Sequence, residues 1–151
     1  MSRNTERRHI RRGEIYYVRL GMRQGSIQMG RRPCIVVQNN TGNKNSPTTI
    51  IIPITSQDKK PIPTHVDLSS VRELVSGSKA IAEQVLTIDQ SELGEYICRL
   101  DKWLMAKVNV ALMISLGLTH FGEWKRVKSS LQKEKSQNRT INEKNVSYEK
   151  K

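Results

Sequence analysis

The sequence contains few of the residues that carry metal or cofactor chemistry. Its two cysteines, Cys34 and Cys98, form no CxxC motif and no cysteine–histidine pair with ligand spacing, which argues against a zinc site. No paired-carboxylate motif is present either, so metal-dependent chemistry is disfavoured and no cofactor is expected. We expect both cysteines to be buried, reduced thiols.

Long hydrophobic runs are also missing. No segment approaches the roughly 20 apolar residues that cross a bilayer, and the arginine-rich start is not followed by the apolar stretch of a signal peptide. These absences predict a soluble, cytoplasmic protein. Aromatic residues make up only 5% of the chain, too few for a base-stacking surface of the kind found in single-strand binders. We therefore expect Trp103 and Trp124 to pack against the protein.

Positive charge is abundant but unevenly distributed. Of the net charge of +12, residues 1–12 contribute +4 and residues 119–151 contribute +5, which leaves +3 for residues 13–118. Basic ends either attract polyanions such as RNA or form solvated, disordered segments, and the sequence leaves both interpretations open. The length of 151 residues favours one domain. We assign it to residues 13–118, between a basic N-terminal extension and a basic tail that is partly helical and then flexible.

The stretch Gly30–Gln57 is the most informative part of the chain. Two apolar runs, Cys34–Val37 and Ile50–Ile54, flank a polar loop rich in glycine, asparagine, serine and proline, a pattern typical of an antiparallel hairpin. If the loop turns near residues 43–44, the numbers of paired residues sum to 87. Arg32 then lies opposite Thr55, which places a cation beside a hydroxyl, a combination suited to phosphate chemistry. A slip of one residue would reverse every side chain.

The remaining pattern predicts a mainly β fold with a late helix. The helix begins after Asp101, a suitable N-cap, and ends at Gly117, a suitable C′ residue. Strands followed by one amphipathic helix indicate a small, strongly bent sheet or barrel that the helix closes. We predict strands at Ile15–Leu20, His65–Leu68, Lys79–Ile88 and Gly94–Leu100, a flexible loop at Gly21–Arg31 and a polar connection at Ser69–Ser78.

Beyond the domain, Phe121, Trp124, Val127 and Leu131 recur at helical spacing and predict a second, shorter amphipathic helix. From Gln132 onward the composition is polar and charged, so we expect little fixed structure there.

Several ordered segments resemble the MazF/PemK toxins of bacterial type II toxin–antitoxin systems. They are RRGEIYYVRL, GRRPCIVVQNNTGNKNSPTTIIIPITSQ, PTHVDL, AEQVLTID and ALMISLGL, which together span roughly residues 12–118. The resemblance implies an SH3-like small β-barrel with a C-terminal helix. It also implies a homodimer that binds single-stranded RNA, including mRNA, in the dimer groove, cleaves it as a ribosome-independent endoribonuclease, and is silenced by a cognate antitoxin.

The resemblance also implies roles for individual residues. Arg32 corresponds to the family's catalytic arginine and Thr55 to its catalytic threonine. Ser26 and Gln28 lie in the RNA-contacting loop, and Gln84 matches a further position associated with substrate binding. In this scheme the arginine stabilises charge on the phosphate, the threonine hydroxyl orients it, and the products are a 2′,3′-cyclic phosphate and a 5′-hydroxyl.

Three positions depart from the pattern of many relatives. Ile27 stands where those relatives have an acidic residue, Met29 where they have glycine, and Leu86 where they have arginine. The resemblance therefore does not carry over the recognised RNA sequence, and weaker cleavage is a second consequence of the same changes.

Several alternatives stay open at this point. Arg31 is a neighbouring cation that could contact phosphate in place of Arg32, and the Gln84 amide could cap backbone groups instead of binding substrate. We assign His65 a structural or surface role because the sequence pairs it with no second catalytic group. The whole chain could also be a non-catalytic binding module, since the gyrase poison CcdB shares this architecture without cleaving RNA, or an inactive relative that binds RNA or an antitoxin.

Overall fold

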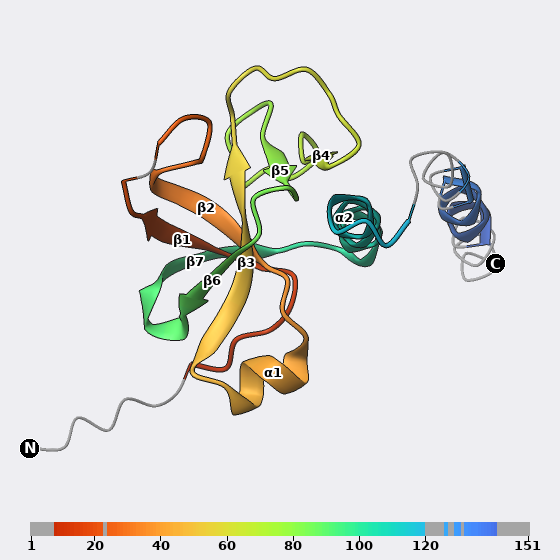
Figure 1. Ribbon diagram of the computed structural model, residues 1–151. Helices are drawn as coiled ribbons and strands as arrows, with labels where there is room; N and C mark the ends of the chain where they lie inside the picture. The colour runs from red at the N-terminus through yellow and green to blue at the C-terminus, as the bar shows by residue number, and fades with distance from the viewer. Residues whose placement is uncertain (1–7, 23, 120–125, 127–128, 131, 142–151) are drawn as a thin grey trace, which may run out of the picture.

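The computed structural model describes residues 8–22, 24–119, 126, 129–130 and 132–141. Within the described part of residues 8–119 the chain forms strands β1 to β7, the α-helices α1 and α2 and one 3-10 turn (Figure 1). The strands are β1 (Glu14–Leu20), β2 (Gly30–Val36), β3 (Thr48–Thr55), β4 (His65–Asp67), β5 (Lys79–Ile81), β6 (Leu86–Asp89) and β7 (Leu93–Arg99). The helices are α1 (Asn40–Asn45) and α2 (Lys102–Ser115), and the 3-10 turn η1 is Gln90–Glu92.

The strands form one antiparallel, strongly bent sheet. Its order is β4-β5-β3-β2-β1-β7, and β6 also pairs with β3. The long strand β3 therefore borders β2 along one edge, and β5 and β6 along the other. Figure 1 shows β3 running through the centre of the molecule, with α2 to one side of the sheet. This arrangement confirms the predicted small, mainly β barrel with a C-terminal helix.

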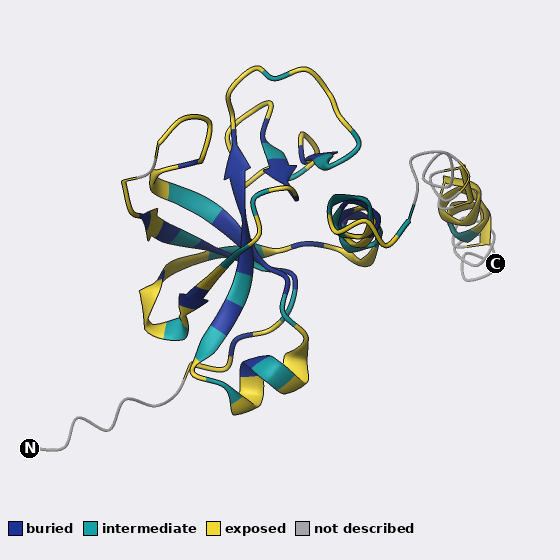
Figure 2. Ribbon diagram, viewed as in Figure 1, coloured by how far each residue is buried: buried dark blue, intermediate teal, exposed yellow. Residues whose placement is uncertain are grey.

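Both faces of the central strands are buried, because successive side chains point to opposite sides of a strand. Ile15, Ile35 and Ile52 face the core that α2 covers with Leu104 and Val108. The intervening residues face a second core, which contains Tyr16, Val18, Cys34, Val36 and Ile51. Figure 2 shows this double burial as dark blue along the middle of β3. The continuous apolar runs of the sequence follow from it.

The connection between β2 and β3 is the short helix α1, where the sequence predicted a loop. Asn39 caps this helix by accepting a hydrogen bond from the Gly42 amide at 2.8 Å. Asn43 is buried, and its Oδ1 accepts from Thr49 Oγ1 at 2.7 Å and from Gln38 Nε2 at 3.1 Å. Asparagine side chains thus satisfy local backbone and core polar groups, and the compact turn leaves the predicted strand register unchanged.

The predicted single strand Lys79–Ile88 is wrong, because a turn at residues 82–85 divides it. The first half, β5, pairs with the Thr55 end of β3, and the second half, β6, pairs with its beginning. Because β3 is strongly bent, its two ends run in different directions. One continuous strand could not pair with both ends, so two short strands do. The predicted strands in β1, β4 and β7 are confirmed to within two residues.

Helix α2 has the predicted ends. Asp101 Oδ1 accepts from the backbone amides of Trp103 at 2.9 Å and Leu104 at 2.8 Å. At the other end Gly117 has φ of 71°, and the Leu118 amide donates to the Met113 carbonyl at 2.8 Å. This pair of features is a Schellman-type stop, in which a left-handed glycine satisfies the last helical carbonyls.

The segments outside the barrel differ in what the structure describes. Ile10 is buried in the second core, and Arg8 Nη1 donates to the carbonyls of Leu93 and Gly94. The apolar residues that predicted a second amphipathic helix lie outside the described residues. Residues 132–141 are helical, which corrects the expectation of little fixed structure, and their glutamate, lysine, glutamine and arginine side chains have good helix propensity. Across the described residues, no helix has the length and apolar character needed to span a membrane.

Candidate active site

Arg32 and Thr55 lie at the same end of the β2–β3 hairpin, each two residues beyond the last pair of the ladder, Cys34 and Pro53. The ladder pairs Cys34 with Pro53, and each further pair keeps the sum of the two residue numbers at 87. Continuing this register by one alternation sets Arg32 opposite Thr55. Because side chains alternate along a strand, both residues project from the same sheet face as Cys34 and Pro53. The predicted register is confirmed for the three residue pairs of this ladder, and the Arg32–Thr55 pair stays a prediction.

Arg32 is half-buried, and a hydrogen bond to the backbone fixes its guanidinium group. Its Nε donates to the carbonyl of Met29 at 2.7 Å, and no hydrogen bond within the described part of the chain engages its two terminal nitrogens. Two parallel N–H donors therefore remain for a phosphate. Burial raises the pKa of the neighbouring Cys34 thiol to about 12, although the charge of Arg32 acts in the opposite direction. The thiol is thus protonated at neutral pH and is no nucleophile.

Thr55 is the last residue of β3, and its side chain is buried. It is 1% exposed, and its Oγ1 accepts from the Gln57 amide at 3.2 Å. The hydroxyl hydrogen remains available for donation. The hydroxyl therefore lies buried at the end of β3, bonded to the backbone amide of Gln57.

Gln84 holds the loop that leads into β2. Its Oε1 accepts from the Gln28 amide at 2.8 Å, and its Nε2 donates to the Ser26 carbonyl at 3.0 Å. Both ends of the amide are therefore occupied by backbone, which favours the capping interpretation over direct substrate contact. Gln28 is itself 6% exposed, and its Oε1 is buried with no hydrogen-bond partner in the described structure.

These contacts connect the loop to the cation. Gln84 fixes residues 26 and 28, and the next residue, Met29, supplies the carbonyl that anchors Arg32. Ser26 remains exposed at the loop surface. Gln84 thus binds the middle of the loop between β1 and β2, and Arg32 binds its end. The two contacts together fix the position of the Arg32 guanidinium.

Arg31 lies away from this pair. Its guanidinium stacks 3.8 Å from the centroid of the Tyr17 ring and lies 3.7 Å from a carboxylate oxygen of Glu95. Alternation along β2 puts its side chain on the face opposite Arg32. Alternation therefore puts Arg32, and not Arg31, on the sheet face that carries Cys34, Pro53 and Thr55.

His65 has a carboxylate partner that the sequence did not indicate, and the pair agrees with the structural role expected for this residue. Its Nε2 lies 2.8 Å from Glu83 Oε1, and its side chain is 7% exposed. Its Nδ1 is buried without a hydrogen-bond partner among the described residues. The pair joins β4 to the segment after β5 and fixes that segment beside Gln84.

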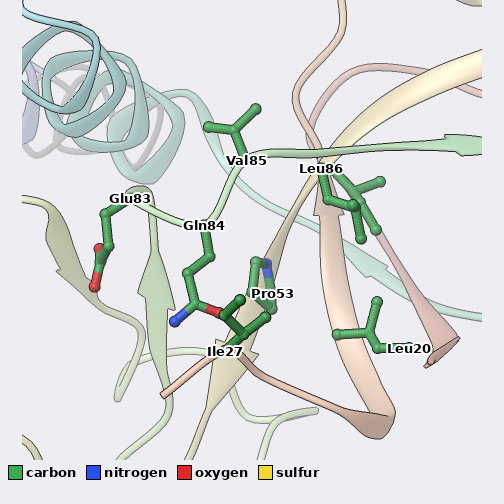
Figure 3. Close-up of a pocket in the computed structure, with 8 residues that line it drawn as sticks. Leu20, Ile27, Pro53, Glu83, Gln84, Val85 and Leu86 are labelled. Atoms are coloured by element: carbon green, nitrogen blue, oxygen red, sulfur yellow. The ribbon is translucent and has the colours of Figure 1, made fainter. Parts of the chain in front are cut away.

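A small pocket of about 230 Å³ opens next to this site (Figure 3). Its lining residues are Leu20, Ile27, Ile51, Pro53, Glu83, Gln84, Val85 and Leu86. Two of the three departures from the family pattern, Ile27 and Leu86, therefore meet in one place although 59 residues separate them. Figure 3 shows Ile27 close to Gln84 and Pro53, with Leu20 and Leu86 along one side.

Sequence reasoning missed the pocket and the Met29 carbonyl. The hairpin register already placed Pro53 on the same face as Thr55, so the strand alternation could have indicated one wall. The other wall depends on the break between β5 and β6, which the apolar run conceals.

Over the described residues, no group of three or more histidine, cysteine, aspartate or glutamate side chains could hold a metal ion.

Comparisons with known proteins agree with this geometry. The profile of the family described as PemK-like, MazF-like toxin of type II toxin–antitoxin system matches residues 11–116. The chain is 43% identical over 118 residues to an endoribonuclease MazF of Staphylococcus epidermidis, covering 77% of this chain and 98% of that protein.

Solved structures show the same fold. A mycobacterial endoribonuclease in complex with its cognate antitoxin superposes with a TM-score of 0.63 at 28% identity, covering 74% of this chain and 98% of the other. MazF from Deinococcus radiodurans gives a TM-score of 0.61 at 26% identity, with 72% and 96% covered. The fold is that of a small toxin barrel. The chain belongs to the PemK-like, MazF-like toxin family of type II toxin–antitoxin systems.

Proposed function

We propose that this protein is the toxin of a type II toxin–antitoxin system and acts as an endoribonuclease on single-stranded RNA. The observation that supports the proposal is the β2–β3 register, which, if extended by two residues, would bring Arg32 opposite Thr55 on one face. The 43% identity to an endoribonuclease MazF supports the same activity. Residues 13–118 form the catalytic domain of this proposal, and the two basic ends add attraction for RNA.

The reaction uses the substrate's own nucleophile. The 2′-hydroxyl attacks the adjacent phosphorus and loses its proton, the bond to the 5′-oxygen breaks, and that oxygen gains a proton. The products are a 2′,3′-cyclic phosphate and a 5′-hydroxyl. This chemistry requires stabilisation of the charge on the phosphate oxygens, and no metal ion is part of the proposed route.

Arg32 supplies that stabilisation. Its two terminal nitrogens are free of protein hydrogen bonds among the described residues, and its Nε is anchored on Met29. A preorganised donor of this kind contributes about 3 kcal/mol to the transition state, by analogy with one oxyanion-hole group. Thr55 orients the phosphate through its hydroxyl. Ser26, Gln28 and Gln84 form the substrate-binding surroundings, with Gln84 acting through the loop backbone. Arg31, on the opposite face of β2, contributes general attraction for RNA.

The working assembly is a cytoplasmic homodimer that a cognate antitoxin inhibits. The mycobacterial relative solved with its cognate antitoxin supports such a partner. RNA and the antitoxin would compete for the groove that contains Arg32.

The decisive experiment incubates purified protein with a long unstructured RNA in EDTA. The wild type should give discrete fragments, and Arg32→Ala should cleave roughly 100-fold more slowly. Thr55→Ala should also lose activity. Arg19→Ala is the matched control. Arg19 is exposed and follows Val18, the β1 partner of Arg32, so its side chain lies on the sheet face opposite Arg32. This variant should keep the wild-type rate within about twofold.

Two outcomes would refute this assignment. Equal cleavage by Arg32→Ala and the wild type would remove Arg32 from the mechanism. Binding of RNA or antitoxin without cleavage by the wild type would favour the non-catalytic module, which the 1% exposure of Thr55 keeps as the second candidate.

A further inference from the structure

Lys79 lies beside Thr55, at the edge of β3 opposite β2. The two residues are direct partners in the β3–β5 ladder, so their side chains share one face of the sheet and their Cβ atoms lie about 5 Å apart. If the β2–β3 register continues to Arg32, then Arg32 and Lys79 flank Thr55 on its two neighbouring strands. Adjacent strands lie about 4.8 Å apart, so the backbones that carry the two cations are separated by about 10 Å.

The ammonium of Lys79 has no carboxylate partner within the described part of the chain. It is half-buried, its Nζ donates to the backbone carbonyl of Lys59 at 2.9 Å, and neither ion pair of the described residues includes it. Asp67 is its partner in the β4–β5 ladder, but the Asp67 carboxylate accepts from the amide and the hydroxyl of Ser69. The hydroxyl and the amide of Ser69 are the main causes of the lowered pKa of Asp67, and the charge of Lys79 is the smallest. A half-buried charge without a counter-ion is costly, and this ammonium retains N–H donors for an anion.

The hydrogen bond to Lys59 fixes the ammonium next to the end of β3. The loop at residues 56–64 follows Thr55, and Figure 1 shows it extending beyond the arrowhead of β3. The Gln57 amide binds this loop to Thr55 Oγ1 at 3.2 Å. Two residues later, the Lys59 carbonyl accepts from Lys79. The same loop carries the exposed Lys60, so the Thr55 end of β3 has a basic rim on the side of β5.

A lysine in this position suits a phosphate. A lysine ammonium is a compact point charge that binds phosphate oxygens without a fixed approach. Phosphates follow one another along an RNA strand, so a strand whose cleaved phosphate lies at Arg32 and Thr55 carries a neighbouring phosphate past β3. On the far side of β3 from Arg32, the cation on the adjoining strand is Lys79.

We propose that Lys79 binds the RNA phosphate next to the cleaved one, as a second phosphate site that the Lys59 carbonyl orients. The inference rests on the proposed endoribonuclease function and deepens it. The contact is to the RNA backbone, so it fixes the strand across β3 without reading a base. It requires both the ammonium of Lys79 and the negative charge of that phosphate.

A carboxylate of a protein partner is the other anion that could meet this ammonium. RNA is favoured because Lys79 and Thr55 are direct partners on one sheet face, so a substrate bound at Thr55 passes the lysine. The experiment separates these two occupants.

The test removes the charge from the full-length protein, from the RNA, and from both. The substrate is a short RNA with one mapped cleavage site, in which the linkage on the 5′ or the 3′ side of the cut is a methylphosphonate on a 2′-deoxy sugar. The same RNA with an ordinary phosphate on that sugar is the reference. Lys79→Met removes the ammonium and keeps most of the side-chain length. Lys44→Met is the matched control, because Lys44 is an exposed lysine of α1, at the opposite end of the β2–β3 hairpin.

With the wild type, the methylphosphonate at one of the two linkages should lower kcat/KM by about tenfold, the usual effect of one hydrogen bond to a charged group. Lys79→Met should cleave the reference RNA about tenfold more slowly, and the methylphosphonate should then slow it by less than about twofold more. Lys44→Met should keep the wild-type response. Lys79→Met should also reduce the slope of log affinity against log salt by about 0.7, the value for one phosphate contact on a single strand.

Two further variants separate the charge of Lys79 from its contact with the loop. Lys79→Arg keeps the charge and should keep the sensitivity to the methylphosphonate. Lys79→Gln keeps a neutral donor for the Lys59 carbonyl and should lose that sensitivity. Lys79→Gln also replaces Lys79→Met if that variant does not fold, as judged by circular dichroism.

The outcomes that overturn the inference differ from those that overturn the proposed function. An equal effect of the methylphosphonate on the wild type and on Lys79→Met would limit Lys79 to anchoring the loop and refute the phosphate site. Unchanged cleavage of every RNA by Lys79→Met would leave the lysine to a protein partner and refute it as well. Both results leave the proposed function intact, whereas failure of the wild type and Lys44→Met to cleave RNA would overturn both.

Discussion

Replacing Gln84 by leucine should loosen the loop before β2 even when no RNA is present. The variant keeps most of the side-chain volume but removes both hydrogen bonds to the loop backbone, at 2.8 Å and 3.0 Å. Each such bond contributes about 1 kcal/mol net, so the loop loses about 2 kcal/mol of local stability. The loss is largest at the Gln28 backbone amide. Gln28 is buried, so water poorly replaces the acceptor that the amide loses.

The assay is native-state hydrogen exchange at the Gln28 amide. A loss of about 2 kcal/mol corresponds to exchange roughly 30-fold faster than in the wild type. Gln84→Glu separates the two bonds, since it keeps an acceptor for Gln28 and loses the donor to Ser26. Exchange at Gln28 should then rise much less. Gln24→Leu is the matched control, because Gln24 is an exposed glutamine of the same loop.

Kinetics connect this loosening to activity. Met29 follows the clamped segment and anchors Arg32, so Gln84→Leu should lower kcat/KM by up to the same factor of roughly 30. Equal exchange rates at the Gln28 amide in Gln84→Leu and the wild type would show that Gln84 does not hold the loop. An effect confined to KM, with unchanged exchange, would instead show that Gln84 contacts RNA directly.

Three other changes have expected outcomes. Truncation after Leu118 removes a net charge of +5, so RNA affinity should fall and depend less on salt, with the cleaved sequence unchanged in fragment mapping; a changed sequence would mean that the tail reads bases. Asp101→Ala removes the cap of α2 and should lower stability by about 1 kcal/mol, measured by urea unfolding, whereas an unchanged midpoint would contradict the cap. Cys34 has a pKa raised by burial from 9.0 to about 12, so its stabilising contribution is complete below pH 9 and is lost as the pH rises towards 12. Iodoacetamide at pH 8 should therefore modify the half-buried Cys98 first, as read by mass spectrometry, and faster modification of Cys34 would show that its burial is wrong.

The sequence predicted the hairpin and its register because both depend on local patterns. Apolar runs on either side of a polar segment define the strands, and the length of that segment sets the register once the turn is placed near residues 43–44. Asp101 and Gly117 predicted the ends of α2 for a similar reason, since capping depends on one residue and its neighbouring backbone. The pairing of Arg32 with Thr55 was therefore within reach of the sequence.

Features that depend on long-range contacts were not predictable in this way. The run Lys79–Ile88 reads as one strand, and only the bend of β3 explains why it divides into two. The His65–Glu83 pair and the two bonds of Gln84 join segments far apart in the chain, and no local pattern encodes them. The convergence of Ile27 and Leu86 belongs to the same class.

The divided pairing of β3 also gives its two ends different cooperativity. The Thr55 end is held by two residue pairs with β5, and the other end by four pairs with β6. Because β5 and β6 are separate strands, the β4–β5 corner can unfold as a small unit while the β6 end stays paired. Such a local opening would uncover Thr55, the most buried member of the candidate site. In the proposed mechanism, access to the Thr55 hydroxyl would then depend on the opening equilibrium of the β4–β5 corner rather than on the global stability of the barrel.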